Sequence, residues 1–112
     1  MSSRMLYHDR VAALTDEALA LRGFTKIFGR QRRVPLERIT SFRLRPASDY
    51  PNEQIPAWGL DDRRVWFTRD PRRWRRTAAI EVTLDTEEIV GFSPAHPGRV
   101  RDLLVELGVT EQ

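Results

Sequence analysis

The stretch Thr77-Ala78-Ala79-Ile80-Glu81-Val82-Thr83-Leu84 decides the fold of this chain, because apolar and polar residues alternate along it. Every even position from 78 to 84 is apolar, whereas Thr77, Glu81 and Thr83 take the other side. A period of two is typical of a strand with one buried face and one face in solvent. We expect this strand to begin at Trp74, in the basic segment before it, and to form the centre of the fold.

A second strand and a helix follow. Val90 and Phe92 repeat the period of two, and Pro94 and Pro97 then end the pairing because proline has no backbone N–H to donate. Apolar residues spaced i, i+3, i+4 and i+7 next predict one buried stripe on a helix; they are Val100, Leu103, Leu104 and Leu107. Pro97 or Gly98 near the first turn and Gly108 after the last turn fit the usual helix ends.

The N-terminal part of the chain predicts a hairpin. Alternation over residues 7–14 and again over 18–22 indicates two short strands, and Thr15-Asp16-Glu17 is typical of a turn between them. A helix over residues 11–21 is the competing interpretation, because alanine and leucine are good helix formers.

Further short strands are expected in the middle of the chain. We predict one over residues 24–34, interrupted near Gly29, one over 39–44, and two around a turn at Asp61-Asp62. Prolines at 46, 51 and 56 make residues 47–57 the longest expected loop. The whole pattern is about seven short strands and one C-terminal helix, which is typical of a small antiparallel barrel or sandwich closed by a helix.

The length of 112 residues fits a single domain over residues 1–112, with a core from about 6 to about 108 and short flexible tails. The chain has no cysteine, which fits a reducing compartment and excludes a thiolate nucleophile. No apolar run has the length of a transmembrane helix or of a signal peptide. We therefore expect a mainly β protein of the cytoplasm.

Four segments form a recognisable series along the chain. They are Leu14-Thr15-Asp16-Glu17-Ala18-Leu19, Val34-Pro35-Leu36-Glu37-Arg38-Ile39, Trp58-Gly59-Leu60, and residues 79–93 with Pro97 and the helix behind them. In order and spacing they resemble bacterial pleckstrin-homology-like (PH-like) domains, although the chain has Thr86-Glu87 where such domains often carry Asp-Gly. The resemblance implies two bent, nearly orthogonal antiparallel sheets in a small barrel, plugged at one end by the C-terminal helix.

The net charge of +3 is unevenly distributed. Residues 22–45 carry eight basic residues and one acidic residue, and residues 63–76 carry seven and one, whereas 46–62 and 77–112 are acidic. Such asymmetry indicates an anion-binding surface, or basic and acidic segments that face each other within the fold or across an oligomer. Lys26 is the only lysine among nineteen basic residues, so genome composition is another explanation for part of the arginine content.

Catalysis has little support in the sequence. The two histidines, His8 and His96, are far apart, and no partner is signalled for either. The acidic pairs Asp61-Asp62 and Glu87-Glu88 are more typical of turns than of metal sites, and the six glycines lack a phosphate-binding spacing. We therefore expect no enzyme, no metal site and no cofactor.

The segment with the most functional content is Arg72-Arg73-Trp74-Arg75-Arg76. Arginines beside an indole can bind phosphate groups while the ring packs at a lipid interface or on a base. A structural role fits the pattern equally well, with Trp74 packed at a sheet edge and its neighbours in solvent, where they protect the edge against aggregation. Trp58, Trp66 and Trp74 recur every eight residues, and an exposed cluster of them would mark a protein interface.

Three hypotheses for function follow. The first is a non-enzymatic PH-like interaction module of the cytoplasm that binds a protein partner or itself, through Trp66 and through Arg72, Arg73, Trp74, Arg75 and Arg76. The second is peripheral binding to anionic lipid headgroups at the inner face of the membrane, with added contacts from Arg30, Arg32 and Arg33. The third is nucleic-acid binding, which the high isoelectric point favours although the sequence has no recognisable DNA or RNA motif.

Overall fold

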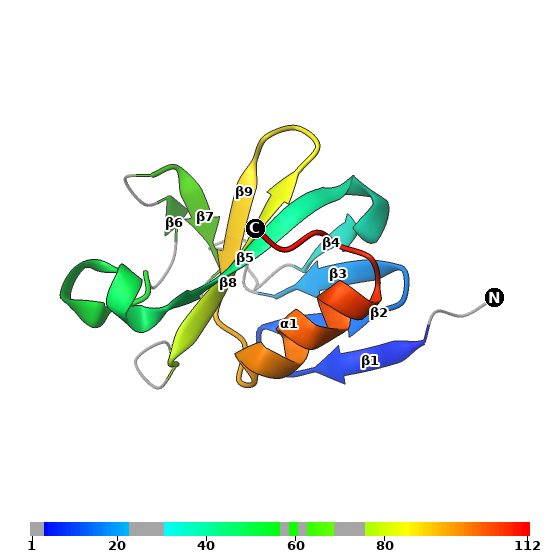
Figure 1. Cartoon of the computed structure of the whole chain (residues 1–112), viewed down its shortest axis with the longest axis horizontal. Coiled ribbons are helices and arrows are strands. Elements are labelled where there is room, and N and C mark those ends of the chain that lie inside the picture. The colour runs from blue at the N-terminus through cyan, green and yellow to red at the C-terminus, as the bar shows by residue number, and fades with distance from the viewer. Residues whose placement is uncertain (1–3, 23–30, 57–58, 61–62, 69–75) are drawn as a thin grey trace.

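The computed structural model describes residues 4–22, 31–56, 59–60, 63–68 and 76–112 (Figure 1). These residues form two β-sheets and one α-helix, so the expected mainly β fold with a C-terminal helix is confirmed. The first sheet is antiparallel with strand order β1-β2-β3-β4; its strands are β1 (Met5–His8), β2 (Ala12–Thr15), β3 (Ala18–Leu21) and β4 (Arg32–Pro35). The second has the order β5-β8-β9-β7-β6; its strands are β5 (Ile39–Pro46), β6 (Gly59–Leu60), β7 (Val65–Phe67), β8 (Ala78–Leu84) and β9 (Ile89–Phe92).

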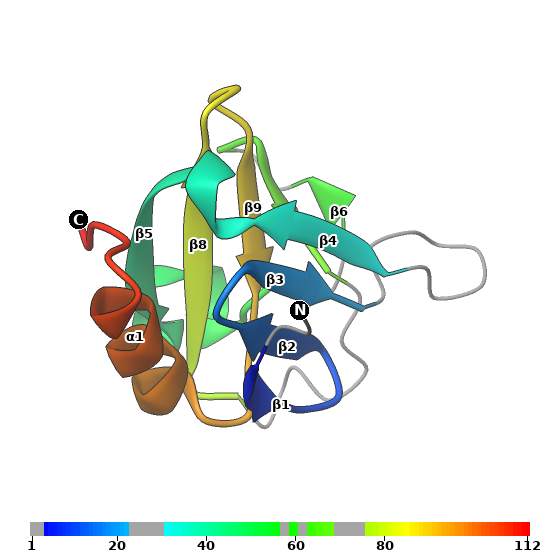
Figure 2. The ribbon, with the colours of Figure 1, turned by 90° about the vertical axis from the view of Figure 1, so that its right-hand side faces the viewer.

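One apolar core lies between the two sheets and the helix α1 (Pro97–Glu106). Leu14 and Leu19 reach it from the first sheet, Phe42 and Val82 reach it from the second, and Leu104 reaches it from α1. Figure 2 shows the first sheet in front of the second, with α1 at the side beside β5 and β8. Among the described strands, no backbone pairing joins the two sheets.

The helix confirms its predicted stripe and both of its predicted ends. Pro97 occupies the first turn, and Val100, Leu103 and Leu104 are buried. At the other end, Gly108 takes φ +88°, its N–H bonds to the carbonyl of Val105 at 3.0 Å, and the N–H of Val109 bonds to the carbonyl of Leu104 at 3.0 Å. This Schellman turn reverses the chain. Because Val109 is buried, the core extends beyond the limit expected near residue 108.

The prediction that one face of β8 lies in solvent is wrong. Ala79 is 0% exposed and Glu81 is 6% exposed, although both point away from the main core. A second apolar cluster covers this face; its members are Tyr50, Ile55, Val65, Phe67 and Ala79. They come from the loop after β5, which contains the 3₁₀ turns η2 (Ala47–Asp49) and η3 (Pro51–Glu53), and from β7. The strand also begins at Ala78, whereas we expected Trp74; residues 69–75 lie outside the described residues.

The described part of the chain has nine strands, compared with about seven expected, partly because the predicted strand over 7–14 is two strands, β1 and β2. The carboxylate of Asp9 accepts the backbone N–H groups of Val11 and Ala12, both at 2.8 Å, which turns the chain between them. The predicted hairpin of β2 and β3 is confirmed, so the competing helix over 11–21 is wrong. In the expected strand over 24–34, only β4 is described, since residues 23–30 lie outside the described residues.

The expectation of purely antiparallel pairing is wrong at one place, because β7 runs parallel to β9. The hairpin of β8 and β9 leaves the far edge of β9 open, and β7 adds there in the same direction as β9. Gly91 makes this approach close, since a Cβ at that position would lie 2.5 Å from Cε1 of Phe67. The connector before β5 is the short 3₁₀ turn η1 (Leu36–Arg38).

Candidate functional site

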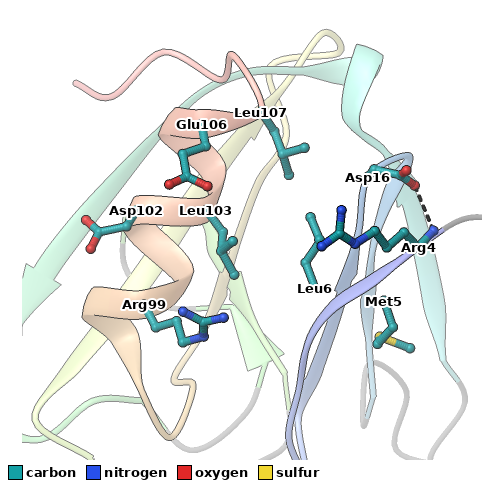
Figure 3. Close-up of a pocket in the computed structure, with 9 residues that line it drawn as sticks. All are labelled: Arg4, Met5, Leu6, Asp16, Arg99, Asp102, Leu103, Glu106 and Leu107. Carbon is teal, nitrogen blue, oxygen red and sulfur yellow. Dashed lines mark hydrogen bonds between the residues drawn. The ribbon is translucent and has the colours of Figure 1, made fainter.

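A groove runs between β1 and α1 (Figure 3). It has a volume of about 660 Å³. Met5 and Leu6 line it from β1, and Leu103 and Leu107 line it from α1 and its C-terminal cap. In Figure 3, Leu6 and Leu103 point toward each other across the groove. Its floor is therefore apolar.

Charged side chains form the rim of the groove; they are Arg4, Asp16, Arg99, Asp102 and Glu106. Asp102 pairs with Arg101 at 3.0 Å, and the carboxylate of Asp16 accepts the backbone N–H of Arg4 at 3.0 Å. Arg99 and Glu106 lie at opposite ends of α1, and neither forms an ion pair with a residue that the structure describes. The rim therefore carries uncompensated charge of both signs.

Hydrogen bonds around Asp9 fix β1 against the start of α1. The carboxylate of Asp9 accepts the hydroxyl of Tyr7 and the backbone N–H of Ala95, the latter at 2.8 Å. The hydroxyl of Tyr7 in turn accepts the N–H of His96 at 3.1 Å. Burial, and then the hydrogen bond to Asp9, raise the pKa of Tyr7 to about 12, so this hydroxyl stays protonated at neutral pH. Both walls of the groove are thus held in place.

The strand β1 is an edge of the first sheet. In the described part of the chain it pairs with β2 alone, and its residues Met5 and Leu6 line the groove. Met5 is 56% exposed, which makes it one of the three large apolar residues with high exposure among those described. Edge strands offer unpaired backbone N–H and C=O groups to an incoming strand. The groove therefore combines a backbone template with apolar contacts.

The edge of β5, on the other side of α1, is covered by the chain itself. The N–H of Phe42 bonds to the carbonyl of Thr110 at 2.9 Å, and the N–H of Gln112 bonds to the carbonyl of Phe42 at 2.8 Å. Residues 110–112 thereby add to β5 in the parallel direction. Arg101 of α1 holds them by two hydrogen bonds to the carboxylate of Glu111, at 2.8 and 2.9 Å.

A second polar cluster lies over the outer face of β8, around the buried carboxylate of Glu81. This carboxylate accepts the hydroxyl of Tyr50 at 3.0 Å and the guanidinium of Arg63 at 2.7 Å. Arg45 approaches it to 3.9 Å and also pairs with Asp49 at 3.2 Å. Burial, and then the charge of Glu81, raise the pKa of Tyr50, which keeps its hydroxyl protonated. Every charge here has a partner, so the cluster holds the loop after β5 on the sheet and is not a candidate ligand site.

The structure describes four of the nine residues that the sequence analysis proposes as contacts. Arg32 donates two hydrogen bonds of 2.7 Å to the carboxylate of Glu88, which lowers the pKa of that carboxylate. Arg33 is exposed and lies 3.9 Å from Glu17, while Trp66 and Arg76 are half-buried. The remaining five lie outside the described residues; they are Arg30, Arg72, Arg73, Trp74 and Arg75. The guanidinium fork of Arg32 is thus engaged within the fold.

The sequence does not reveal the groove, because the groove forms between residues 4–6 and residues 99–107, which are far apart in the chain. Its only local signal is the apolar pair Met5-Leu6 next to a predicted strand. The histidines form no catalytic pair with each other: His8 lies 2.9 Å from the guanidinium of Arg22, and the N–H of His96 binds Tyr7. Within the described residues, no three acidic or histidine side chains converge in a way that could hold a metal ion.

The described α-helix is too short and too polar to span a bilayer. Comparisons with protein-family models, with curated proteins and with solved structures found no match. The site is therefore interpreted from its own geometry and chemistry.

Proposed function

We propose that this chain is a non-enzymatic, PH-like interaction module of the cytoplasm that binds an extended segment of a partner protein in the groove between β1 and α1. One observation carries the proposal: an edge strand with a single neighbour among the described strands borders a groove that has apolar residues on both walls and a charged rim. A segment added to β1 would gain backbone hydrogen bonds from the strand and apolar contacts from Leu6 and Leu103.

The PH-like barrel is part of this proposal. Support comes from the order of the elements: an antiparallel sheet of the first four strands, a second sheet, and a terminal helix with its apolar stripe in the core. In this arrangement α1 plugs one end of the barrel, and the groove is the seam between the plug and the first strand. The strand β1 forms one side of this groove, and among the described strands it is paired only with β2.

The geometry favours a protein partner over an anionic surface. The rim of the groove has three carboxylates and two guanidinium groups, so it lacks the uniformly positive charge that favours phosphate groups. Arg32, which was expected to contact lipid headgroups, is paired with Glu88. Self-association remains one form of the proposal, in which the extended segment comes from a second copy.

The test is an NMR titration of the ¹⁵N-labelled chain with a neutral eight-residue peptide of alternating valine and threonine. We expect shifts at the amides of β1 and α1 and none at β6. Met5→Glu should weaken binding about threefold or more, because it removes an apolar contact and places an unpaired carboxylate in the groove. Val105→Glu is the matched control, since Val105 is 47% exposed on α1 and does not line the groove.

Three outcomes would overturn the proposal. Shifts confined to other elements, or equal binding by Met5→Glu and the native chain, would exclude the groove. Flotation with anionic liposomes or retention on duplex DNA at low salt, together with no peptide shifts, would support the lipid or nucleic-acid hypothesis instead. Reversal of Arg72, Arg73, Arg75 and Arg76 to glutamate would then test the basic segment.

A further inference from the structure

We infer that the groove binds its partner segment with a fixed polarity. An acidic side chain of the segment lies beside Arg99, a basic side chain lies beside Glu106 and Asp16, and apolar residues between them cover Leu6 and Leu103. This inference rests on the proposed function and adds to it the chemistry and the direction of the segment.

The charges on α1 have the signs that the helix itself disfavours. Arg99 is in the first turn, where the helix dipole is positive, and Glu106 is the last helical residue, where it is negative. The first turn has no acidic residue and the last turn has no basic one. The helix thus has a like charge at each end, which costs stability and brings no benefit within the helix.

No ion pair or hydrogen bond within the described residues engages the charged group of either side chain. Arg101 and Asp102, which lie between them on α1, pair with each other, and Arg101 also binds Glu111. Arg99 and Glu106 have no such partner there, and both line the groove. A residue that breaks a local preference without structural compensation is expected to serve function. We therefore infer that Arg99 and Glu106 each bind an oppositely charged side chain of the partner.

The groove is consequently polarised along its length. Figure 3 shows Arg99 at one end and Glu106 at the other, with Asp16 and Arg4 across the groove near the same end as Glu106. That end therefore carries two carboxylates and one guanidinium. The hydrogen bond from His96 to Tyr7 fixes the start of α1 beside the end of β1, so the strand runs opposite to the helix. The positive charge of Arg99 therefore faces the end of β1, and the net negative charge of Asp16, Glu106 and Arg4 lies near its beginning.

The spacing of the two charges sets the spacing in the partner. Glu106 lies seven positions after Arg99 on the helix, which corresponds to a distance of about 10 Å along the helix axis at a rise of about 1.5 Å per residue. An extended segment covers that length in about three or four residues, at about 3.3 Å each. The segment is therefore expected to carry its acidic and basic residues about three or four positions apart. A uniformly basic or uniformly acidic segment would leave like charges together at one end.

Four peptides test the inference, each with the valine–threonine pattern and two substituted positions four residues apart. The substituted pairs are glutamate with lysine, two lysines, two glutamates, and two glutamines. The glutamate–lysine peptide should bind about fivefold more tightly than the glutamine peptide at low salt, and this advantage should shrink at high salt. Equal binding of all four would overturn the polarity and leave the groove intact, whereas no binding by any of them would overturn the proposed function as well.

The direction is tested by a spin label at the glutamate end of that peptide. In the native chain the label should broaden the amides near Arg99. In the double variant Arg99→Glu with Glu106→Arg it should broaden those near position 106, because the two charges have changed places. The double variant should also unfold at higher denaturant, since it agrees with the helix dipole. An unchanged peptide direction in this variant would overturn the inference without affecting the proposed function.

Discussion

The helix α1 is flanked by two sheet edges that differ in one respect. The edge of β5 is covered by residues 110–112, which bind Phe42 through its N–H and its carbonyl. The strand β1, whose Met5 and Leu6 line the groove, has β2 as its only neighbour among the described strands. The same helix therefore borders one covered edge and one open edge.

Three features of the sequence cover the edge of β5. Gly108 allows the chain to reverse after α1, Val109 anchors it in the core, and Arg101 binds Glu111. An exposed edge is an aggregation hazard that proteins normally protect. In the proposed function, the edge of β1, which has only β2 beside it among the described strands, receives the partner segment.

The largest effect should come from the anchor that builds the open edge. Asp9→Ala removes the acceptor for Val11, Ala12, Ala95 and the hydroxyl of Tyr7, and should lower the free energy of unfolding by about 3 kcal/mol. Urea unfolding measures this loss in the free energy of unfolding. Asp16→Ala is the control, because among the described residues that exposed carboxylate accepts only the N–H of Arg4, and its loss should cost about 0.5 kcal/mol or less. Equal losses would mean that Asp9 does not fix β1.

A smaller loss is expected where the covered edge is anchored in the core. Val109→Ala removes two buried methyl groups and should cost about 2 kcal/mol in the free energy of unfolding. The hydrogen exchange of the Phe42 amide should also become faster, because its acceptor Thr110 follows the anchor directly. Val105→Ala, at an exposed site on α1, should change neither quantity. Unchanged exchange at Phe42 in Val109→Ala would show that residues 110–112 are held without this anchor.

The turn between α1 and residues 110–112 should contribute less to the free energy of unfolding than the burial of Val109 does. Gly108→Ala places a Cβ at φ +88° and should cost about 1 kcal/mol, measured by urea unfolding. Gly98→Ala is the matched control, because Gly98 has ordinary helical geometry with open space around it and the change should stabilise the chain by up to about 1 kcal/mol. If both variants changed stability in the same direction, the backbone of Gly108 would not explain the turn.

The sequence predicts the local elements of this fold better than its surfaces. The stripe of Val100, Leu103 and Leu104 and the hairpin of β2 and β3 depend on spacing within about a dozen residues, and both are confirmed. The outer face of β8 depends on Tyr50, which lies 31 residues before Glu81. No periodicity within β8 can reveal such a cover.

The candidate site was missed for the same reason. The composition indicates a binding role for the arginine-rich segments. However, one of their residues, Arg32, is paired within the fold with Glu88, which lies 56 residues later in the chain. The groove arises where Leu6 meets Leu103, at opposite ends of the chain. Even so, the charge pattern of α1 was available in the sequence, since Arg99 and Glu106 oppose the helix dipole wherever the helix packs.

The smallest effect is a pH-dependent loosening of the covered edge. The hydrogen bonds from Arg101, and then its charge, hold the pKa of Glu111 below its ordinary value of 4.5. A carboxyl group whose pKa is lower in the folded state stabilises the fold above its unfolded pKa, and this contribution is lost as the pH falls through the lower value. The amide signals of Phe42 and Gln112 should therefore shift toward those of a released segment below about pH 4.5.

Glu111→Gln separates this titration from that of the other acidic residues. The variant has no carboxylate for Arg101 to bind, so its Gln112 amide should already report a loosened segment at pH 6 and should change little on acidification. Because Arg101 and Glu111 are exposed, added salt should weaken the difference between the two chains. The same pH response in the native chain and in the variant would show that residues 110–112 stay on β5 without the ion pair. The backbone bonds to Phe42 and the burial of Val109 would then be what covers this edge.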